Sequence, residues 1–305
     1  MSKRVTMIGS ANIDFIMQLP HLPQKGESVT EGVFRQMYGG KGLNQALAAR
    51  RAGAPVTPVV SLGDDSFGQN ILATCLKEGM DDTAVVLHPD SPCGTAMIYI
   101  DENSDNTIGI AMGANALLSV EQVEKAESAI AESGILMLQM EIPDEPMIRA
   151  VELAKRHDAE VMLNYAPFRK SSLALDENIA ILIVNETEAG WLTQSRVESV
   201  EEAEKAAVRL LEKGHRLVVV TLGKNGSILA DKDGIRRNPA FKIEAVDATA
   251  AGDTFCGALA AALVEGMELD AAARLASAAG ALCASRLGAQ ASIPRREEIE
   301  TFMKS

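Results

Sequence analysis

Residues 245–257 read AVDATAAGDTFCG and place a carboxylate, Asp253, at the start of an alanine-rich run with the composition of a helix. Ala250, Ala251 and Gly252 before it are small, so backbone N–H groups of the first helical turn stay open to a ligand. Such a turn stabilises an anion, including a phosphoryl group in transfer, and Asp253 there can accept a proton from an attacking hydroxyl. An acidic residue near a helix start is also a common helix cap, and this stretch alone leaves both interpretations open.

Around this stretch, apolar strand-like segments alternate with amphipathic helical segments. Strands are expected at 5–9, 56–60, 83–87, 135–140, 160–163, 181–184 and 217–221. Helices are expected at 42–52, 65–78, 120–132, 145–157 and 200–213, with two alanine-rich helices within 252–287. Near-continuous apolar strands separated by helices are typical of a parallel sheet covered on both faces. The pattern predicts an α/β fold with a doubly wound, mostly parallel sheet, as a single domain over residues 1–305.

Two segments, at about 13–38 and 94–112, depart from this pattern. Both alternate apolar and polar residues, with Gly, Asn and Asp at the turns, which is typical of antiparallel strands. Because both are inserted between elements of the α/β core, we expect them to form one small sheet that acts as a lid. An apolar side on such a lid indicates either a covered active site or a dimer contact.

Composition excludes several classes of partner. The net charge is −13 and Lys and Arg form only isolated doublets, which argues against nucleic acid. The four cysteines form no CxxC pair, so neither a disulfide framework nor a zinc site is expected. The N-terminal residues have the pattern of a first strand rather than a signal peptide, and no apolar stretch reaches the roughly 20 residues that span a bilayer. We therefore expect a cytoplasmic protein.

Polar residues follow most of the expected parallel strands. Ligands of open parallel sheets bind outside the carboxyl ends of the strands, so these side chains are expected to converge. Asn12 and Asp14 follow the first strand; a carboxylate beside an amide suits the hydroxyls of a polyol, although both residues are also common in turns. Asn185 and Glu188 have the spacing of a helix capping box, and the acidic residues there could also hold magnesium through waters. The other polar residues at strand ends are Glu141, Asn164 and Thr221.

A glycine-rich segment, YGGKGLN at 38–44, enters the helical pattern at 42–52. Its three glycines let a ligand lie against the backbone and the helix start, while Lys41 adds a charge and Asn44 an amide. The spacing matches neither G-x-x-x-x-G-K-[ST] nor G-x-G-x-x-G, so neither that phosphate loop nor a dinucleotide fingerprint is supported. An ordinary glycine-rich loop before a helix is the alternative.

Taken in order, these segments resemble the ribokinase family of sugar and nucleoside kinases from Gly9 to about Glu298. Two signatures carry the resemblance, GGKGLNQA at 39–46 and DATAAGDTF at 247–255. NETE at 185–188 and TLGKNG at 221–226 are similar to connecting motifs of that family. The resemblance implies a ribokinase-like doubly wound domain with a β lid that often forms a homodimer contact. It also implies transfer of the γ-phosphoryl group of ATP, with magnesium, to a sugar hydroxyl.

The resemblance further implies roles for individual residues. Asp253 would be the general base, beside an anion hole formed by Ala250, Ala251 and Gly252. The residues that would bind the sugar are Asn12, Asp14, Gly40, Lys41, Asn44, Glu141 and Asp253. The nucleotide would meet Asn185, Thr221, Gly223 and Gly226, with Glu188 near the magnesium. A monovalent cation, potassium, would lie near Asp247, Thr249, Arg286, Gly288 and Ser292, several of them through backbone carbonyls.

Three positions depart from the common form of the family. Ala248 and Ala250 stand where Thr and Gly are usual, and Tyr165 stands where Pro usually follows the Asn. These departures concern the geometry of the anion hole and the pocket wall, and so substrate identity more than phosphoryl transfer. We expect an ATP-dependent kinase acting on a pentose, with ribose as the first choice. The alternatives are a nucleoside or ketohexose kinase of the same fold and a non-catalytic sugar-binding regulator; an aromatic content of 4% disfavours a nucleoside.

Overall fold

The structure, a computed structural model, describes residues 3–103, 105–173 and 176–304. Within these residues nine strands form one sheet in the order β13-β12-β11-β10-β9-β8-β1-β4-β5. The strands from β11 to β5 are parallel, which confirms the expected α/β sheet. Their bounds are β1 (Arg4–Ile8), β4 (Val56–Gly63), β5 (Val85–His88), β8 (Ser133–Gln139), β9 (Glu160–Asn164), β10 (Ile179–Asn185) and β11 (Leu217–Thr221). An antiparallel hairpin that the sequence patterns did not predict, β12 (Ser227–Asp231) and β13 (Gly234–Asn238), extends one edge.

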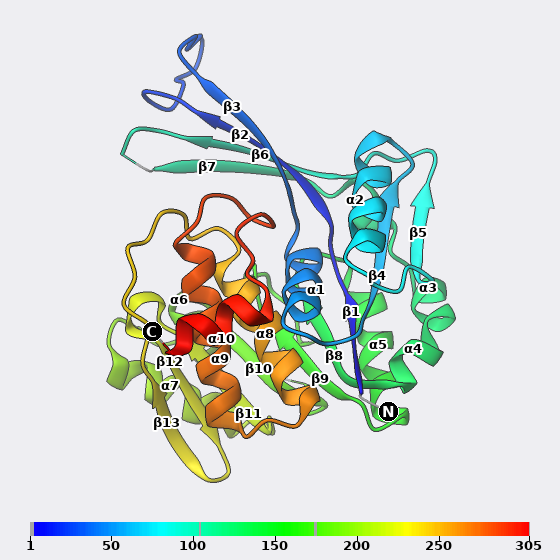
Figure 1. Ribbon diagram of the computed structural model, residues 1–305, viewed down its shortest axis with the longest axis vertical. Helices are drawn as coiled ribbons and strands as arrows, with labels where there is room; N and C mark the ends of the chain where they lie inside the picture. Colours follow the sequence, from blue (N-terminus) through cyan, green and yellow to red (C-terminus); the bar gives the residue numbers. More distant parts are fainter. Residues whose placement is uncertain (1–2, 104, 174–175, 305) are drawn as a thin grey trace.

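Helices cover both faces of this sheet (Figure 1). One face carries α1 (Lys41–Arg51), α2 (Ser66–Lys77), α8 (Ala251–Glu265), α9 (Leu269–Ala284) and α10 (Arg296–Lys304). The other carries α3 (Val120–Lys125), α4 (Glu127–Ala131), α5 (Asp144–Arg156), α6 (Glu186–Thr193) and α7 (Val200–Leu211). The single helix expected over 120–132 is divided at Ala126 into α3 and α4.

The continuous apolar character of the strands has a direct structural cause. Along β10, Ile181 and Ile183 belong to the core under α8 and α9, whereas Leu182 and Val184 belong to the core under α5 and α7. Successive side chains of a strand point to opposite faces, so a sheet covered on both faces needs apolar residues at every position.

A second, four-stranded sheet of described residues has the order β3-β2-β6-β7 and projects from the main body (Figure 1). Its strands are β2 (Asn12–Gln18), β3 (Val33–Gly39), β6 (Gly94–Ile100) and β7 (Asn106–Ala111), and we call it the lid sheet. The two inserted segments therefore form one sheet, as expected. They join through a parallel pairing of β2 with β6, so the expectation of antiparallel strands holds only within each insertion.

The topology also fixes where a ligand site can form. Strand β1 lies between β4 and β8, so the chain builds the sheet outward in both directions from this point. The carboxyl ends of strands that diverge in this way leave a crevice, where open α/β sheets bind ligands. In the part of the chain that the structure describes, no helix has the length and apolar character needed to cross a membrane.

Candidate active site

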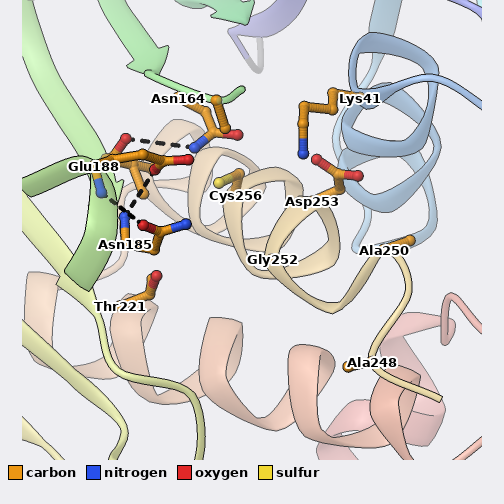
Figure 2. Close-up of a pocket in the computed structure, with 12 residues that line it drawn as sticks. Lys41, Asn164, Asn185, Glu188, Thr221, Ala248, Ala250, Gly252, Asp253 and Cys256 are labelled. Atoms are coloured by element: carbon orange, nitrogen blue, oxygen red, sulfur yellow. Dashed lines mark hydrogen bonds between the residues drawn. The ribbon is translucent and has the colours of Figure 1, made fainter. Parts of the chain in front are cut away.

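A cavity of about 190 Å³ opens at the carboxyl ends of β9, β10 and β11, beside the start of α8 (Figure 2). Lys41 and Asp253 lie on one side of the α8 start in this view, and Asn185, Glu188 and Thr221 lie on the other (Figure 2). The full lining is Lys41, Asn164, Ala166, Ile183, Asn185, Glu188, Thr221, Ala248, Ala250, Gly252, Asp253 and Cys256. The fold thus brings together residues expected at the sugar, the nucleotide phosphates and the magnesium.

Asp253 lies in the first turn of α8 but does not cap it. The N-cap residue is Ala250, which has no side-chain cap hydrogen bond. The Asp253 carboxylate instead accepts hydrogen bonds from Asn44 Nδ2 at 3.1 Å and from Gln45 Nε2 at 3.0 Å, both from α1. These contacts form because α1 and α8 are in close contact: a Cβ on Gly257 would come within 2.3 Å of the Gln45 carbonyl oxygen. The carboxylate is therefore oriented by another helix rather than by its own.

The first turn of α8 leaves room for an anion. The Thr254 N–H donates to the Ala250 carbonyl at 2.8 Å, so the Gly252 and Asp253 N–H groups precede the first regular α-helical bond. A Cβ on Gly252 would meet no atom within 4 Å, which leaves open space beside these donors. Unpaired N–H groups at a helix start bind phosphate and similar anions. Ala250 has φ 61°, a left-handed conformation in which the Gly usual in the family would be unstrained.

Lys41 contacts Glu141 through its backbone and lines the cavity with its side chain. It begins α1 directly after Gly40, whose φ of 87° favours glycine, and its N–H donates to Glu141 Oε2 at 2.9 Å. Its side chain lines the cavity. The nearby Asp253 carboxylate, followed by Glu141, raises the pKa of Lys41, so its ammonium group stays charged. The expectation placed Lys41 at the sugar; its side chain also faces the region expected to hold phosphates.

Asn12 and Asp14 lie on the same face of β2, two residues apart, although neither lines the cavity itself. Asn12 Oδ1 accepts from Asn115 Nδ2 at 2.7 Å. Asp14 lies against Gly39, where a Cβ would come within 2.1 Å of Asp14 Oδ2. Burial, with the nearby carboxylates of Glu141 and Asp253, raises the pKa of Asp14 to about 7. These polar groups form the part of the site nearest the lid sheet.

Glu141, after the end of β8, links this part to the cavity. Its Oε2 accepts from the Ser10 hydroxyl as well as from the Lys41 N–H. The carboxylate thereby ties the carboxyl ends of β1 and β8 to the start of α1, as its position after the strand predicts.

Asn185 and Glu188 form a complete capping box at the start of α6 and also line the cavity. Asn185 Oδ1 accepts from the Glu188 N–H at 2.8 Å, and Glu188 Oε2 accepts from the Asn185 N–H at 2.9 Å. Burial raises the pKa of Glu188. No cluster of three metal-ligating side chains occurs among the described residues. A magnesium ion at Glu188 would therefore take its remaining ligands from phosphates and water, as Mg²⁺ commonly does.

The expected nucleotide glycines differ in what surrounds them. Gly223 begins a short 3-10 helix (Gly223–Asn225) with φ 50° and has open space where a Cβ would stand. Gly226 has φ 88°, and a Cβ there would come within 2.1 Å of the Asn238 carbonyl oxygen. Neither glycine is among the residues lining the cavity. The close approach of β13 therefore explains why residue 226 is a glycine, without reference to any ligand.

The loops expected to hold a monovalent cation meet beside the α8 start. Asp247 accepts hydrogen bonds from the N–H groups of Thr249 at 2.9 Å and Gly288 at 3.0 Å. Cys283 Sγ lies 3.5 Å from the Thr249 carbonyl oxygen and 3.0 Å from Ser292 Oγ. The Arg286 side chain instead pairs with Glu298 at 2.8 Å, so it is engaged away from Asp247 and Ser292.

Tyr165, one of the departures from the family form, is not among the residues that line the cavity. Its side chain is buried, and its hydroxyl donates to the Arg169 carbonyl at 2.5 Å. Tyr165 therefore stabilises the loop after β9, whose Ala166 forms part of the cavity wall.

Several residues of the site were not predicted as such. Ala166, Ile183 and Cys256 line the cavity, but small and apolar residues carry no sequence signal for a site. All four cysteines are buried and free, and burial raises the pKa of the Cys256 thiol, which stays protonated. Gln45 bonds directly to Asp253; its place in GGKGLNQA was the only signal for it.

Comparisons with known proteins agree with this geometry. A model of the family described as pfkB family carbohydrate kinase matches residues 2–296. A ribokinase of Haemophilus influenzae is 38% identical over 304 residues, which cover 100% of this chain and 99% of that protein. A deoxyribokinase of Salmonella typhi is 32% identical over 300 residues, 98% of each chain. The solved structure of Arabidopsis thaliana ribokinase complexed with ribose and ATP superposes with a TM-score of 0.91 at 31% identity, covering 100% of both chains.

Proposed function

The chain belongs to the pfkB family of carbohydrate kinases, and we propose that it transfers the γ-phosphoryl group of ATP to a hydroxyl of ribose. The observation that carries the proposal is the meeting of three features in one cavity: the Asp253 carboxylate, the Lys41 ammonium group and the open first turn of α8. Phosphoryl transfer needs a base for the attacking hydroxyl and positive potential at the transferred group. ATP as the donor also favours a cytoplasmic site of reaction.

We propose that Asp253 acts as the general base. Both of its oxygens are held by amide donors of α1, so the carboxylate is presented in one orientation. It removes the proton of the sugar hydroxyl as that oxygen forms a bond to the γ-phosphorus. The bond between this phosphorus and the bridging oxygen of ADP breaks, and ADP leaves with that oxygen.

The sugar is proposed to bind between β2 of the lid sheet and the start of α1. Asn12 and Asp14 share one face of β2, and Glu141 and Gly40 border the start of α1. Asn44 Oδ1 is buried without a hydrogen-bond partner while its Nδ2 is bonded to Asp253. An unpaired buried acceptor costs free energy until a donor reaches it, and a sugar hydroxyl is such a donor.

The triphosphate is proposed to lie over the start of α8 and along the ends of β10 and β11. A Cβ on Gly252 would stand in open space there, and Gly252, Asp253, Asn185 and Thr221 line the same cavity. Lys41 supplies a fixed positive charge near the transferred group. Magnesium, held at Glu188 with phosphates and water, would supply further positive charge to the transferred phosphoryl group.

A monovalent cation, potassium, is proposed between the loops joined by Asp247. The Asp247 carboxylate accepts hydrogen bonds from the Thr249 and Gly288 N–H groups, and these bonds bring the two loops together beside Ala250 and Ala251. Carbonyl and hydroxyl oxygens are suitable ligands for such a hard cation. Higher turnover in potassium than in sodium or cation-free buffer is expected; identical rates in all three would remove this part of the proposal.

A second copy of the chain is proposed to cover the lid sheet, giving a homodimer. One face exposes Phe34 and Met97, and the other exposes Ile108 and Ile110; each of these side chains is about half exposed. A projecting sheet with apolar side chains on both faces is characteristic of a protein contact.

The test is an assay of ADP release with ATP and magnesium over ribose, 2-deoxyribose, fructose and adenosine. The highest kcat/KM is expected for ribose. Deoxyribose is the second candidate, because a deoxyribokinase is similar over 98% of this chain. Turnover of adenosine or fructose above both pentoses would contradict the pentose assignment. No turnover with any acceptor would favour a sugar-binding regulator.

A further inference from the structure

A chain of amide side chains connects the end of β8 with Asp253. Gln139, the last residue of β8, donates from Nε2 to Gln45 Oε1 at 2.8 Å. Gln45, in α1, donates from Nε2 to Asp253 Oδ1 at 3.0 Å and to Asn164 Oδ1 at 2.9 Å. Gln45 and Gln139 are both 0% exposed. The hydrogen bonds thus join four segments, β8, α1, β9 and α8, and one branch ends at Asp253, the proposed base.

The Asp253 carboxylate, which can only accept hydrogen bonds, sets the direction of the Gln45 amide. Both of its N–H bonds are used, toward Asp253 and Asn164, and its oxygen accepts from Gln139. If the amide were reversed, its oxygen would face the oxygens of Asp253 and Asn164, and its N–H groups would face the Gln139 donor. In a dry interior such contacts are strongly unfavourable. Gln139 therefore helps to keep the Gln45 donors directed at Asp253.

Gln45 and Asn44 hold the same carboxylate but have different further contacts. Asn44 Nδ2 bonds to Asp253 Oδ2, and its own oxygen is left without a partner. Gln45 has all its polar atoms bonded within the protein and no exposure, so it cannot itself contact a substrate. Any effect of Gln45 on turnover must therefore pass through the groups it bonds.

We propose that Gln45 is a positioning residue for phosphoryl transfer: it fixes the Asp253 carboxylate for proton removal, and Gln139 in turn fixes Gln45. The inference rests on the proposed role of Asp253 as general base. With one donor on each oxygen, the plane of the carboxylate cannot rotate without breaking a hydrogen bond. Loss of the Gln45 donor frees that rotation, and small misplacements of a reacting group slow catalysis strongly.

The test compares kcat and KM for ribose, at saturating ATP, in wild type and five variants. These are Gln45→Met, Gln139→Met, the double variant of both, Asp253→Asn and the control Gln122→Met. Methionine keeps the length of the side chain and removes the amide. Gln122 is a matched control: it is also buried, and it bonds to Ser61 Oγ at 2.7 Å and to the Val60 and Ala84 carbonyls, far from Asp253 in the bonding network. Circular dichroism confirms the folded fraction of each protein.

Gln45→Met is expected to lower kcat by about 10- to 100-fold with little change in KM for ribose. Gln139→Met is expected to lower kcat by a smaller factor, and the double variant to be no slower than Gln45→Met, because Gln139 acts through Gln45. Gln122→Met is expected to lose thermal stability but to keep its kcat.

Wild-type kcat in Gln45→Met would overturn the inference, as would equal losses in Gln45→Met and Gln122→Met. A double variant whose loss is the product of the single losses would show that Gln139 does not act through Gln45. If Gln45→Met does not fold, the kcat of Gln139→Met is compared with that of Gln122→Met. A lower kcat in Gln139→Met alone would support the inference, and equal values would overturn it. An active Asp253→Asn would instead remove the general base itself, which separates failure of the proposed mechanism from failure of this inference.

Discussion

Asp14 gives the site a pH dependence that can be measured. Burial, with Glu141 and Asp253 nearby, raises the pKa of Asp14 to about 7. In the free enzyme the Asp14 side chain therefore changes from the neutral acid to the carboxylate as pH rises through this value. The carboxylate accepts hydrogen bonds from two sugar hydroxyls more readily than the neutral acid does. We therefore expect kcat/KM for ribose to rise between about pH 6 and pH 8, since kcat/KM reports groups of the free enzyme.

Two variants assign this titration to Asp14. Glu141→Gln removes a neighbouring negative charge and should move the midpoint of the rise to lower pH. Asp14→Asn should lower kcat/KM and remove the rise. A midpoint that stays in place in both variants would assign the titration to another group.

Ala250 carries backbone strain at the helix start. Its φ of 61° costs an L-residue roughly 1 kcal/mol, and glycine adopts this conformation without that cost. Ala250→Gly is expected to raise the free energy of unfolding by about 0.5–1 kcal/mol, measured by urea denaturation. Ala251→Gly is the matched control: Ala251 is the first helical residue of α8, and the change there should lower stability. Equal destabilisation by both changes would show that residue 250 is not strained.

At the scale of the element, the start of α8 combines an open first backbone turn with the Asp253 carboxylate, which accepts its hydrogen bonds from side chains of α1. The capping interpretation of Asp253 is wrong, because the bonds of the carboxylate go to α1. At α6 the outcome is different: the Asn185–Glu188 capping box exists, and the same residues line the cavity. At the start of α6 the same residues therefore cap the helix and line the cavity. At the start of α8 the cavity-lining carboxylate, Asp253, does not cap the helix.

Gly252 tests the open turn directly. Among the described residues, a Cβ there would have no neighbour within 4 Å outside its own helical turn, so Gly252→Ala should fold normally and hold or raise the melting temperature through its better helix propensity. The methyl group would enter the space proposed for the transferred phosphoryl group, and kcat should fall by about 100-fold or more. Gly109→Ala, in β7 with equally open space, is the control and should keep its kcat. Full activity in Gly252→Ala would place the phosphoryl group elsewhere.

At the scale of the whole molecule, the projecting lid sheet is the feature that an isolated chain leaves unexplained. Phe15 stacks on Phe34 at 5.8 Å between ring centroids, and this face continues to Met97. Phe34→Glu combined with Met97→Glu is expected to convert a dimer to a monomer in analytical ultracentrifugation. Ile235→Glu, at an exposed apolar position on β13 outside the lid sheet, should leave the dimer unchanged. A monomeric wild-type protein would contradict the proposed contact.

The main fold could be predicted from the sequence because strands buried on both faces have a continuous apolar pattern. The β12–β13 hairpin was not predicted. Strand β13 is short and mostly exposed, and its sequence, GIRRN, contains two adjacent charged residues, so it lacks the apolar pattern of a buried strand. The parallel pairing of β2 with β6 joins segments about 80 residues apart, which local patterns cannot specify. Within the site, the contact of Gln45 with Asp253 spans 208 positions and depends on the close packing of α1 on α8 at Gly257.

The central claim is that Asp253, at the start of α8, removes the proton of the sugar hydroxyl. The most direct test is the kcat of Asp253→Asn with ribose and ATP, read beside its melting temperature and its affinity for ribose by calorimetry. A fall in kcat of about 10²- to 10⁴-fold, with folding and ribose affinity nearly intact, is the result expected for loss of a general base. A variant that keeps its kcat but melts early would contradict the account and return Asp253 to a purely structural role.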